Sequence, residues 1–204
     1  MTSTHVFKGD LPADVKITGS VAIDTETTGL NLTRDRLCLV QMADASGKTY
    51  IVQIAKGQTS APNLVRVLTD KSIKKLFHYG RFDIAIMKAA FDALCVNVYC
   101  TKTASRLCRT FTDRHGLKDL CKDLLGISIS KQEQTSDWGA DTLTGEQLAY
   151  AASDVIHLHA LKAKLDEMLA RENRTELAQK CFDFLPVRAE LDLAGWPDFD
   201  IFAH

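Results

Sequence analysis

Residues 20–30 read Ser-Val-Ala-Ile-Asp-Thr-Glu-Thr-Thr-Gly-Leu, an apolar run that ends in two acidic residues and a turn. The stretch from Ser20 to Asp24 predicts a buried strand, because short apolar segments bounded by turn residues are typical of strands. Asp24 and Glu26 then stand at the carboxyl end of that strand. Buried carboxylates are costly unless something neutralises them. A bound metal ion would do so, and salt bridges or a helix cap at the strand end would do so equally well.

Strand patterns also dominate the neighbouring sequence. Residues 37–42 and 49–54 predict two further strands, joined by a hairpin through Asp44, Ser46 and Gly47. Shorter strands are expected at 75–78 and 96–99, with helices at 61–69 and 82–91.

Helical periodicity dominates the second half of the chain. Helices are expected at 102–109, 117–125 and 145–171. Thr144 and Gln147 form a capping box at the start of the last helix. The pattern as a whole predicts an α/β fold with a mixed sheet of about five strands.

Length and charge narrow the function classes. The chain has 204 residues, which is the size of one domain, and we expect a single domain over 1–204 with a short tail from about residue 186. Its 25 Lys and Arg residues are balanced by 26 Asp and Glu residues. Proteins that hold long nucleic acids over many phosphates are usually basic, so this balance argues against that class but allows a short nucleic acid.

Hydropathy and cysteine spacing indicate in which cellular compartment the protein is expected. No uncharged stretch approaches the length of a membrane span, and residues 1–16 lack the pattern of a secretory signal. The six cysteines form no Cys-x-x-Cys pair, which argues against a zinc site. We expect reduced, mostly buried thiols in a cytoplasmic protein.

Four more side chains are candidates for chemistry. Asp83 begins an apolar helix, where the helix dipole alone favours a carboxylate. Tyr150 and Asp154 are spaced i, i+4 and therefore share one helix face among alanines. They could form a metal ligand beside a hydroxyl that orients water, or simply a buried Tyr–Asp hydrogen bond. Trp138 could stack on a base or pack in the core.

Together, these residues have the composition of a metal-dependent hydrolase site. Two divalent cations about 4 Å apart can hold an attacking water and a leaving oxygen in phosphodiester hydrolysis. Oxygen ligands favour Mg²⁺ or Mn²⁺ over Zn²⁺. The four carboxylates and the tyrosine would supply such a site: Asp24, Glu26, Asp83, Asp154 and Tyr150.

Three motifs carry a resemblance to a known superfamily. Residues 21–30 (VAIDTETTGL), 78–84 (HYGRFDI) and 150–155 (YAASDV) resemble the motifs of the DEDD 3′–5′ exonucleases, with the tyrosine of the DEDDy branch. The resemblance covers roughly residues 10–169 and implies a ribonuclease H-like mixed sheet of five strands flanked by helices. Residues 136–138 (SDW) and 143–150 (LTGEQLAY) resemble the ribonuclease D branch, although that branch tends to carry basic residues where GADT stands at 139–142.

The C-terminal sequence narrows the resemblance. Residues 195–202 (GWPDFDIF) in a neutral chain resemble the nanoRNase C family, oligomeric enzymes that degrade very short oligoribonucleotides, including dinucleotides. The aromatic residues of this tail suit either docking on a neighbouring copy or folding back on the same chain.

The resemblance implies roles for individual residues. Asp24, Glu26 and Asp154 would hold the first metal, Asp24 would bridge to the second, and Asp83 would support the second. Tyr150 would orient the attacking water. The implied substrate-binding residues are Thr25, Thr27, Gly29, Leu30, His78 and Trp138, with Leu30 as a wedge against the terminal bases. Candidates for the 5′-phosphate contact are Arg106, Arg109, Arg114 and Lys118.

Three functions remain open at this stage. The first is a 3′–5′ exoribonuclease of short RNA that releases nucleoside 5′-monophosphates. The second is a ribonuclease D-like trimming enzyme or a DNA 3′–5′ exonuclease, which would be expected to carry a basic track. The third is a catalytically dead nucleic-acid-binding module, which would be expected to have lost carboxylates.

Overall fold

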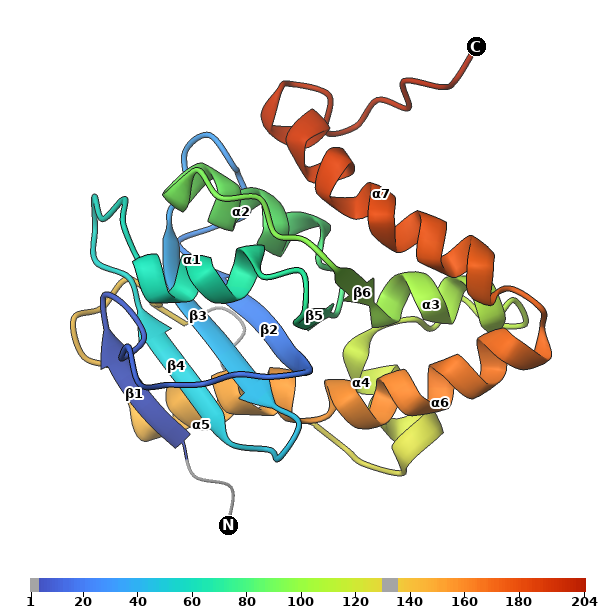
Figure 1. The fold of residues 1–204 in the computed structure, drawn as a ribbon, viewed down its shortest axis with the longest axis horizontal. Helices are drawn as coiled ribbons and strands as arrows, with labels where there is room; N and C mark the ends of the chain where they lie inside the picture. Colours follow the sequence, from blue (N-terminus) through green and yellow to red (C-terminus); the bar gives the residue numbers. More distant parts are fainter. Residues whose placement is uncertain (1–3, 130–135) are drawn as a thin grey trace.

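A mixed sheet forms the centre of the computed structural model, which describes residues 4–129 and 136–204. Within these residues, six strands lie in the order β1-β4-β3-β2-β5-β6 (Figure 1). The strands are β1 (Thr4–Lys8), β2 (Ser20–Thr27), β3 (Leu37–Asp44), β4 (Thr49–Gln53), β5 (Lys74–Phe77) and β6 (Val98–Cys100). Strands β2, β3 and β4 form an antiparallel meander, while β5 and β6 continue the sheet in parallel with β2.

Helices cover both faces of the sheet. They are α1 (Pro62–Thr69), α2 (Arg81–Phe91), α3 (Thr101–Cys108), α4 (Leu117–Leu120), a π-helical turn η1 (Cys121–Leu125), α5 (Gly145–Ile156), α6 (Leu158–Arg171) and α7 (Thr175–Leu193). Helices α1 and α2 pack on one face, and α5 crosses the other (Figure 1). The α/β class and the mixed sheet predicted from the sequence are confirmed.

The side chains of β2 point alternately to the two faces of the sheet. Val21 and Ile23 point into the cluster under α1 and α2, whereas Ala22 belongs to the cluster on the opposite face. Successive side chains of a strand alternate between faces, so Asp24 and Glu26 continue the Ala22 side, where α5 lies. The pairing with β3 is regular until a register shift between Glu26 and Thr27 ends the strand.

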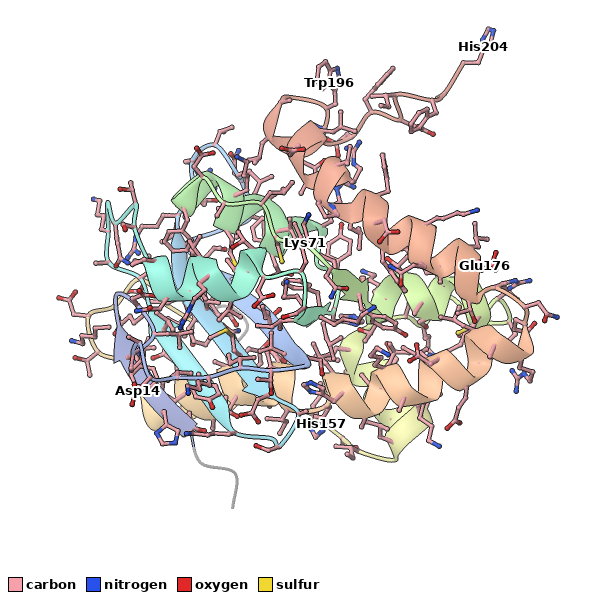
Figure 2. The ribbon with its side chains drawn as sticks, in the orientation of Figure 1. Asp14, Lys71, His157, Glu176, Trp196 and His204 are labelled. Atoms are coloured by element: carbon pink, nitrogen blue, oxygen red, sulfur yellow. The ribbon has the colours of Figure 1, made fainter. Side chains whose placement is uncertain are left out.

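Two expectations about elements were wrong. A sixth strand, β1, extends the sheet at its edge by pairing in parallel with β4. Its signal is weak because it is short, and its residues are at most half buried. The single helix expected over 145–171 is two helices, α5 and α6, which meet at His157 (Figure 2).

The break at His157 has a packing reason. Ala151 of α5 packs against the sheet, whereas Leu161 and Leu165 of α6 pack in the cluster with α3 and α7. One straight helix could not contact both surfaces. The apolar spacing runs through the break without a gap, which is why periodicity did not reveal it.

The C-terminal segment is helical further than expected. The tail predicted from about residue 186 begins later, because α7 continues through the buried Pro186 to Leu193. Beyond it, Trp196 and His204 lie on chain that extends away from the body (Figure 2). Exposed apolar side chains gather on α7 and this tail: Leu177, Phe184, Val187, Trp196, Phe199, Ile201 and Phe202.

One buried carboxylate ties the tail to the domain. Arg81 of α2 binds Asp192 of α7 through Nε and a terminal nitrogen, at 2.5 and 2.7 Å. Arg188 binds the same carboxylate at 2.6 Å. Both arginines also donate to the Pro197 carbonyl, and Arg188 donates to that of Trp196. Asp192 therefore fixes the start of α2, the end of α7 and the first tail residues together.

The cysteines are free thiols, as expected. Five of them are buried, and Cys181 is half buried. Among the described residues, no helix is long and apolar enough to cross a membrane.

Removing the Asp192 carboxylate should destabilise the domain. In Asp192→Ala, two arginines lose their shared carboxylate in a mostly buried site, and a lost charged hydrogen-bond partner of this kind costs about 1–3 kcal/mol. We expect a fall of that size in the free energy of unfolding measured by urea denaturation. Glu190→Ala, an exposed carboxylate on the same helix, is the matched control and should change it by less than about 0.5 kcal/mol. Equal effects in both variants would contradict the assigned role of Asp192.

Candidate active site

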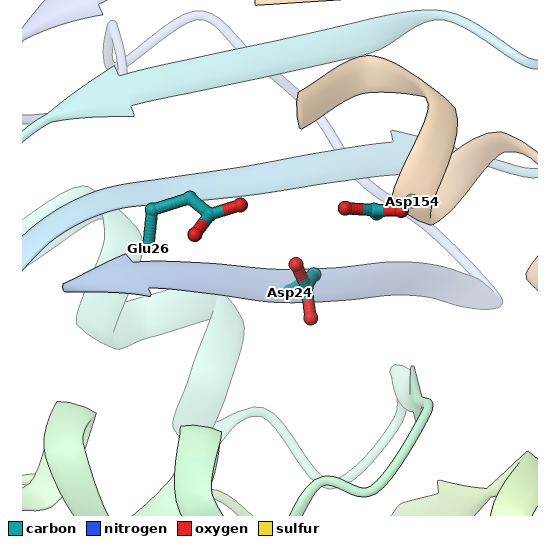
Figure 3. Close-up of side chains that lie close together, drawn as sticks. All are labelled: Asp24, Glu26 and Asp154. Atoms are coloured by element: carbon teal, nitrogen blue, oxygen red, sulfur yellow. The ribbon is translucent and has the colours of Figure 1, made fainter. Parts of the chain in front are cut away.

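Three carboxylates converge where β2 passes under α5. Asp24 and Glu26 come from β2, and Asp154 comes from α5. One oxygen from each lies within 4.8 Å of the others. Figure 3 shows Glu26 and Asp154 reaching toward one another, with Asp24 on the strand between them. Three hard oxygen ligands at this spacing suit a divalent cation such as Mg²⁺ or Mn²⁺.

Asp154 is placed by the start of its own helix. The Thr144 hydroxyl accepts a hydrogen bond from the Gln147 backbone, and the Gln147 side chain accepts one from the Thr144 backbone. This capping box fixes where α5 begins. Ala151, one turn before Val155, is fully buried against the sheet and allows the close approach that brings Asp154 over β2.

Asp83 joins the site from the opposite side of the sheet. It lies in the first turn of α2 and is only 5% exposed. Thr25 donates a hydrogen bond of 2.6 Å to one of its oxygens. Thr25 stands between Asp24 and Glu26 in β2, so this bond connects Asp83 to the strand that carries the other carboxylates. The four acidic residues predicted from the sequence therefore lie around one strand end.

Tyr150 lies one helical turn before Asp154, on the same face of α5. Burial, followed by the nearby Asp154 and Glu26 charges, raises the pKa of the Tyr150 phenol well above its ordinary value. The group therefore stays protonated at neutral pH and cannot serve as a base there. The Trp138 ring packs 6.0 Å from the Tyr150 ring and is only 3% exposed, so in this conformation it presents little surface for stacking on a base.

Burial and mutual repulsion make the carboxylates unusually basic. Burial raises the pKa of Glu26 to about 8, with the charges of Asp154 and Asp83 adding to the shift. Burial also raises the pKa of Asp24, Asp83 and Asp154. A cluster that resists ionisation in this way gains most from a cation that supplies the missing positive charge.

His78 is held as a neutral ring. Thr101 donates its hydroxyl hydrogen to the Phe77 carbonyl, so its oxygen accepts from Nδ1 of His78 at 2.9 Å. Burial, followed by the Lys102 charge, lowers the pKa of His78 to about 3. The Nε2 atom is then a hydrogen-bond acceptor. His78 follows the end of β5, which runs parallel to β2, so its backbone lies at the same sheet edge as the carboxylates.

The loop after β2 presents an apolar side chain. Leu30 is 83% exposed. Thr27 donates to the Gly29 carbonyl at 2.6 Å and so shapes the turn before it. A Cβ at Gly29 would lie 2.4 Å from an oxygen of Asp35, so a larger residue there would have to displace the Asp35 carboxylate.

The four basic residues considered for the 5′-phosphate contact differ in how exposed they are. Arg109 is buried and paired with Asp123 at 2.6 Å, so its charge is already used. Arg106, Arg114 and Lys118 are exposed. His157 lies between α5 and α6, and His159 bonds Ser20 at 3.1 Å.

Sequence reasoning missed one residue next to the carboxylates. Gln41 of β3 donates from Nε2 to Asp24 Oδ2 at 2.8 Å. The available signal was a polar residue within the apolar run Leu-Cys-Leu-Val-Gln-Met-Ala at 37–43.

The raised pKa of Glu26 predicts how the metal-free protein responds to pH. Because its folded pKa lies above its ordinary value of 4.5, ionising Glu26 costs more in the folded state. Its contribution to stability is present at acidic pH and is lost as pH rises toward 8. In chelator, the melting temperature of the wild type should therefore fall relative to Glu26→Gln between pH 5 and pH 8.

The comparison with Glu26→Gln cancels the contributions of the histidines, which both proteins share. Glu176→Gln, an exposed change on α7, serves as the control and should track the wild type. Parallel pH curves for the wild type and Glu26→Gln would contradict the prediction.

Known proteins share this sequence pattern. The profile of the 3'-5' exonuclease family matches residues 4–170. Ribonuclease D of Gluconacetobacter diazotrophicus is 36% identical over 156 residues, which cover 76% of this chain and 39% of that protein. DNA polymerase I of Aquifex aeolicus is 38% identical over 156 residues, covering 72% of this chain and 24% of that protein. The chain thus matches less than half the length of these relatives.

Solved structures share the fold. Brucella melitensis NrnC with bound Mg²⁺ superimposes with a TM-score of 0.95 and 54% identity over 100% of both chains. The same protein bound to pGG gives 0.96, again with 54% identity and 100% coverage of both. Escherichia coli RNase D gives 0.75 at 24% identity, covering 89% of this chain and 46% of that one, which supports the fold.

The family match includes all three motifs that carry the carboxylates and the tyrosine. It confirms the resemblance inferred from those motifs. The chain belongs to the 3′–5′ exonuclease family.

Proposed function

We propose that this protein is a two-metal-dependent 3′–5′ exoribonuclease that degrades short oligoribonucleotides, including dinucleotides, to nucleoside 5′-monophosphates. The observation that carries the proposal is the convergence of Asp24, Glu26 and Asp154, whose oxygens lie within 4.8 Å of one another. The full-length similarity to a nuclease solved with bound Mg²⁺ and with pGG supports it.

The chain's own groups suggest how the reaction proceeds. Asp24, Glu26 and Asp154 would hold the first Mg²⁺ or Mn²⁺, with Asp24 bridging to a second that Asp83 supports. When bound, such a pair acidifies the attacking water and stabilises the leaving oxygen. Tyr150 keeps its proton at neutral pH, and its hydroxyl would hydrogen-bond to the attacking water. Tyr150 then orients the water and leaves its deprotonation to other groups.

The surrounding residues form the proposed pocket for the RNA end. Leu30 would wedge against the terminal bases, and backbone groups around Thr25 and Glu26 would meet the terminal 3′-hydroxyl. Thr27 and Gly29 belong to the same proposed substrate-binding set. The neutral His78 offers Nε2 to a hydroxyl donor. Trp138 would support this pocket by packing its ring against that of Tyr150.

Two remaining features bear on the proposed oligomeric state and cellular compartment. The exposed aromatic residues of the tail suit contacts between copies of this chain in a homo-oligomer. The free thiols suit the reducing cytoplasm.

Removing the Tyr150 hydroxyl should slow the reaction without breaking the site. In Tyr150→Phe the ring still packs on Trp138, and only the water-orienting group is lost. We expect kcat on a 5′-phosphorylated RNA dinucleotide in Mg²⁺ to fall about 10²- to 10⁴-fold, with little change in KM.

The matched control is Tyr50→Phe, which removes a hydroxyl bonded to Asp44 at the hairpin, 3.1 Å away. It should keep normal turnover. If Tyr150→Phe also turned over normally at saturating substrate, the tyrosine would be a packing residue.

Activity should favour the shortest RNAs and depend weakly on salt. A dinucleotide engages few phosphates, whereas each further phosphate contact on a single strand adds roughly 0.7 to the slope of log K against log salt. A chain of net charge −1 offers no general attraction for a long polyanion. The measurement is kcat/KM for 5′-phosphorylated RNAs of 2, 4 and 20 nucleotides, and for a DNA dinucleotide, at two salt concentrations.

Faster turnover of the 20-nucleotide RNA at both salts would replace this proposal with a ribonuclease D-like trimming enzyme. No hydrolysis of any substrate, together with retained binding, would indicate a dead nuclease module.

A further inference from the structure

Gln41 is a buried amide in direct contact with the site. Its side chain has no exposed surface, and it lies in the middle of β3, whose other core residues are apolar. The strand register pairs it with Asp24, so the 2.8 Å bond from Nε2 to Asp24 Oδ2 joins immediate cross-strand neighbours. The contact is therefore built into the sheet and does not depend on a loop.

The position of Gln41 places it on the floor of the site. Leu39, two residues earlier on the same face, packs with Trp138 and Ala151 of α5. On the other side of Gln41 the register places Ile51 of β4, from the same cluster. The amide thus lies on the α5 face of the sheet, with the Asp24 carboxylate on one side and an apolar wall on the other.

One end of this amide has no partner. Within the described residues, Oε1 of Gln41 accepts no hydrogen bond although it is buried. A buried acceptor without a donor lowers stability, and an apolar side chain of the same size would avoid that cost. Packing alone therefore does not explain a glutamine here, whereas the bond to Asp24 does.

We propose that Gln41 is a positioning residue that fixes the plane of the Asp24 carboxylate for metal binding. A carboxylate surrounded by three others is pushed to rotate away from them. By holding Oδ2 from the β3 side, Gln41 keeps the carboxylate turned toward Glu26 and Asp154. The inference rests on the proposed function, because it assigns Gln41 to the same metal site.

The choice of donor fits this role. An amide N–H holds a carboxylate oxygen without adding a charge that would compete with a cation. Groups that orient metal ligands in this way typically contribute about 10- to 100-fold to metal affinity or activity.

The test is Gln41→Met, which keeps the approximate length and volume of the side chain and removes the Nε2 donor together with the unpaired Oε1. We expect the Mn²⁺ concentration that half-saturates binding, measured by calorimetry, to rise at least about tenfold. The rise in melting temperature from chelator to a fixed Mn²⁺ concentration should shrink accordingly. On the RNA dinucleotide, kcat should fall about tenfold or more while KM stays within about twofold.

Two further variants sharpen the result. Gln53→Met is the matched control, because Gln53 also donates from Nε2, but to the Ala140 carbonyl at 2.8 Å, away from the carboxylates. It should leave Mn²⁺ binding and kcat unchanged. Gln41→Asn keeps an amide that is one methylene too short to reach Asp24, and it should reproduce the loss even if Gln41→Met folds poorly.

The outcomes separate the two proposals. Inactive wild-type protein would overturn the proposed exoribonuclease function. The Mn²⁺ titration of the Gln41 variants would then still test the positioning role. An active wild type with unchanged Mn²⁺ half-saturation and kcat in both Gln41 variants would overturn the positioning role. A lower melting temperature in chelator, without those changes, would likewise show that Gln41 acts only in packing.

Discussion

Repulsion among four carboxylates is the constraint around which this molecule is arranged. Asp24 and Glu26 share one strand, and Asp83 and Asp154 approach it from helices on opposite faces. Like charges at such distances would separate on a flexible scaffold. The central position of β2, hydrogen-bonded on both sides by β3 and β5, prevents that movement. Burial, with this repulsion added to it, raises the pKa of Asp24 and Glu26, and a bound divalent cation would offset both effects.

Neutral donors, not cations, support these acids. Thr25 holds Asp83 through a hydroxyl, and Gln41 holds Asp24 through an amide. None of the ion pairs found in the described part of the chain includes one of the four acids. A lysine or arginine at these places would satisfy the carboxylates and so weaken their affinity for metal. Neutral donors fix direction while leaving the negative charge available.

The sequence revealed the site better than the details of the fold. Asp24 and Glu26 were predictable because two acids at the end of an apolar strand demand a partner, and the three motifs together pointed to one site. The edge strand β1 was missed because it is short and half exposed. The helix break at His157 was missed because apolar spacing continues through it. Gln41 and the Thr101–His78 bond depend on which strands and helices become neighbours, and a one-dimensional pattern does not contain that information.

The Asp192 cluster sets a limit on how the C-terminus can be altered. The carbonyls of Trp196 and Pro197 are part of the arginine coordination that holds α2 and α7 together. A protein shortened to residue 195 would lose both acceptors and leave guanidinium donors of Arg81 and Arg188 facing an open gap. A fusion joined at His204 keeps them, because the chain there already extends away from the body (Figure 2). For protein engineering, a shortened chain should therefore keep Pro197, four residues after the end of α7.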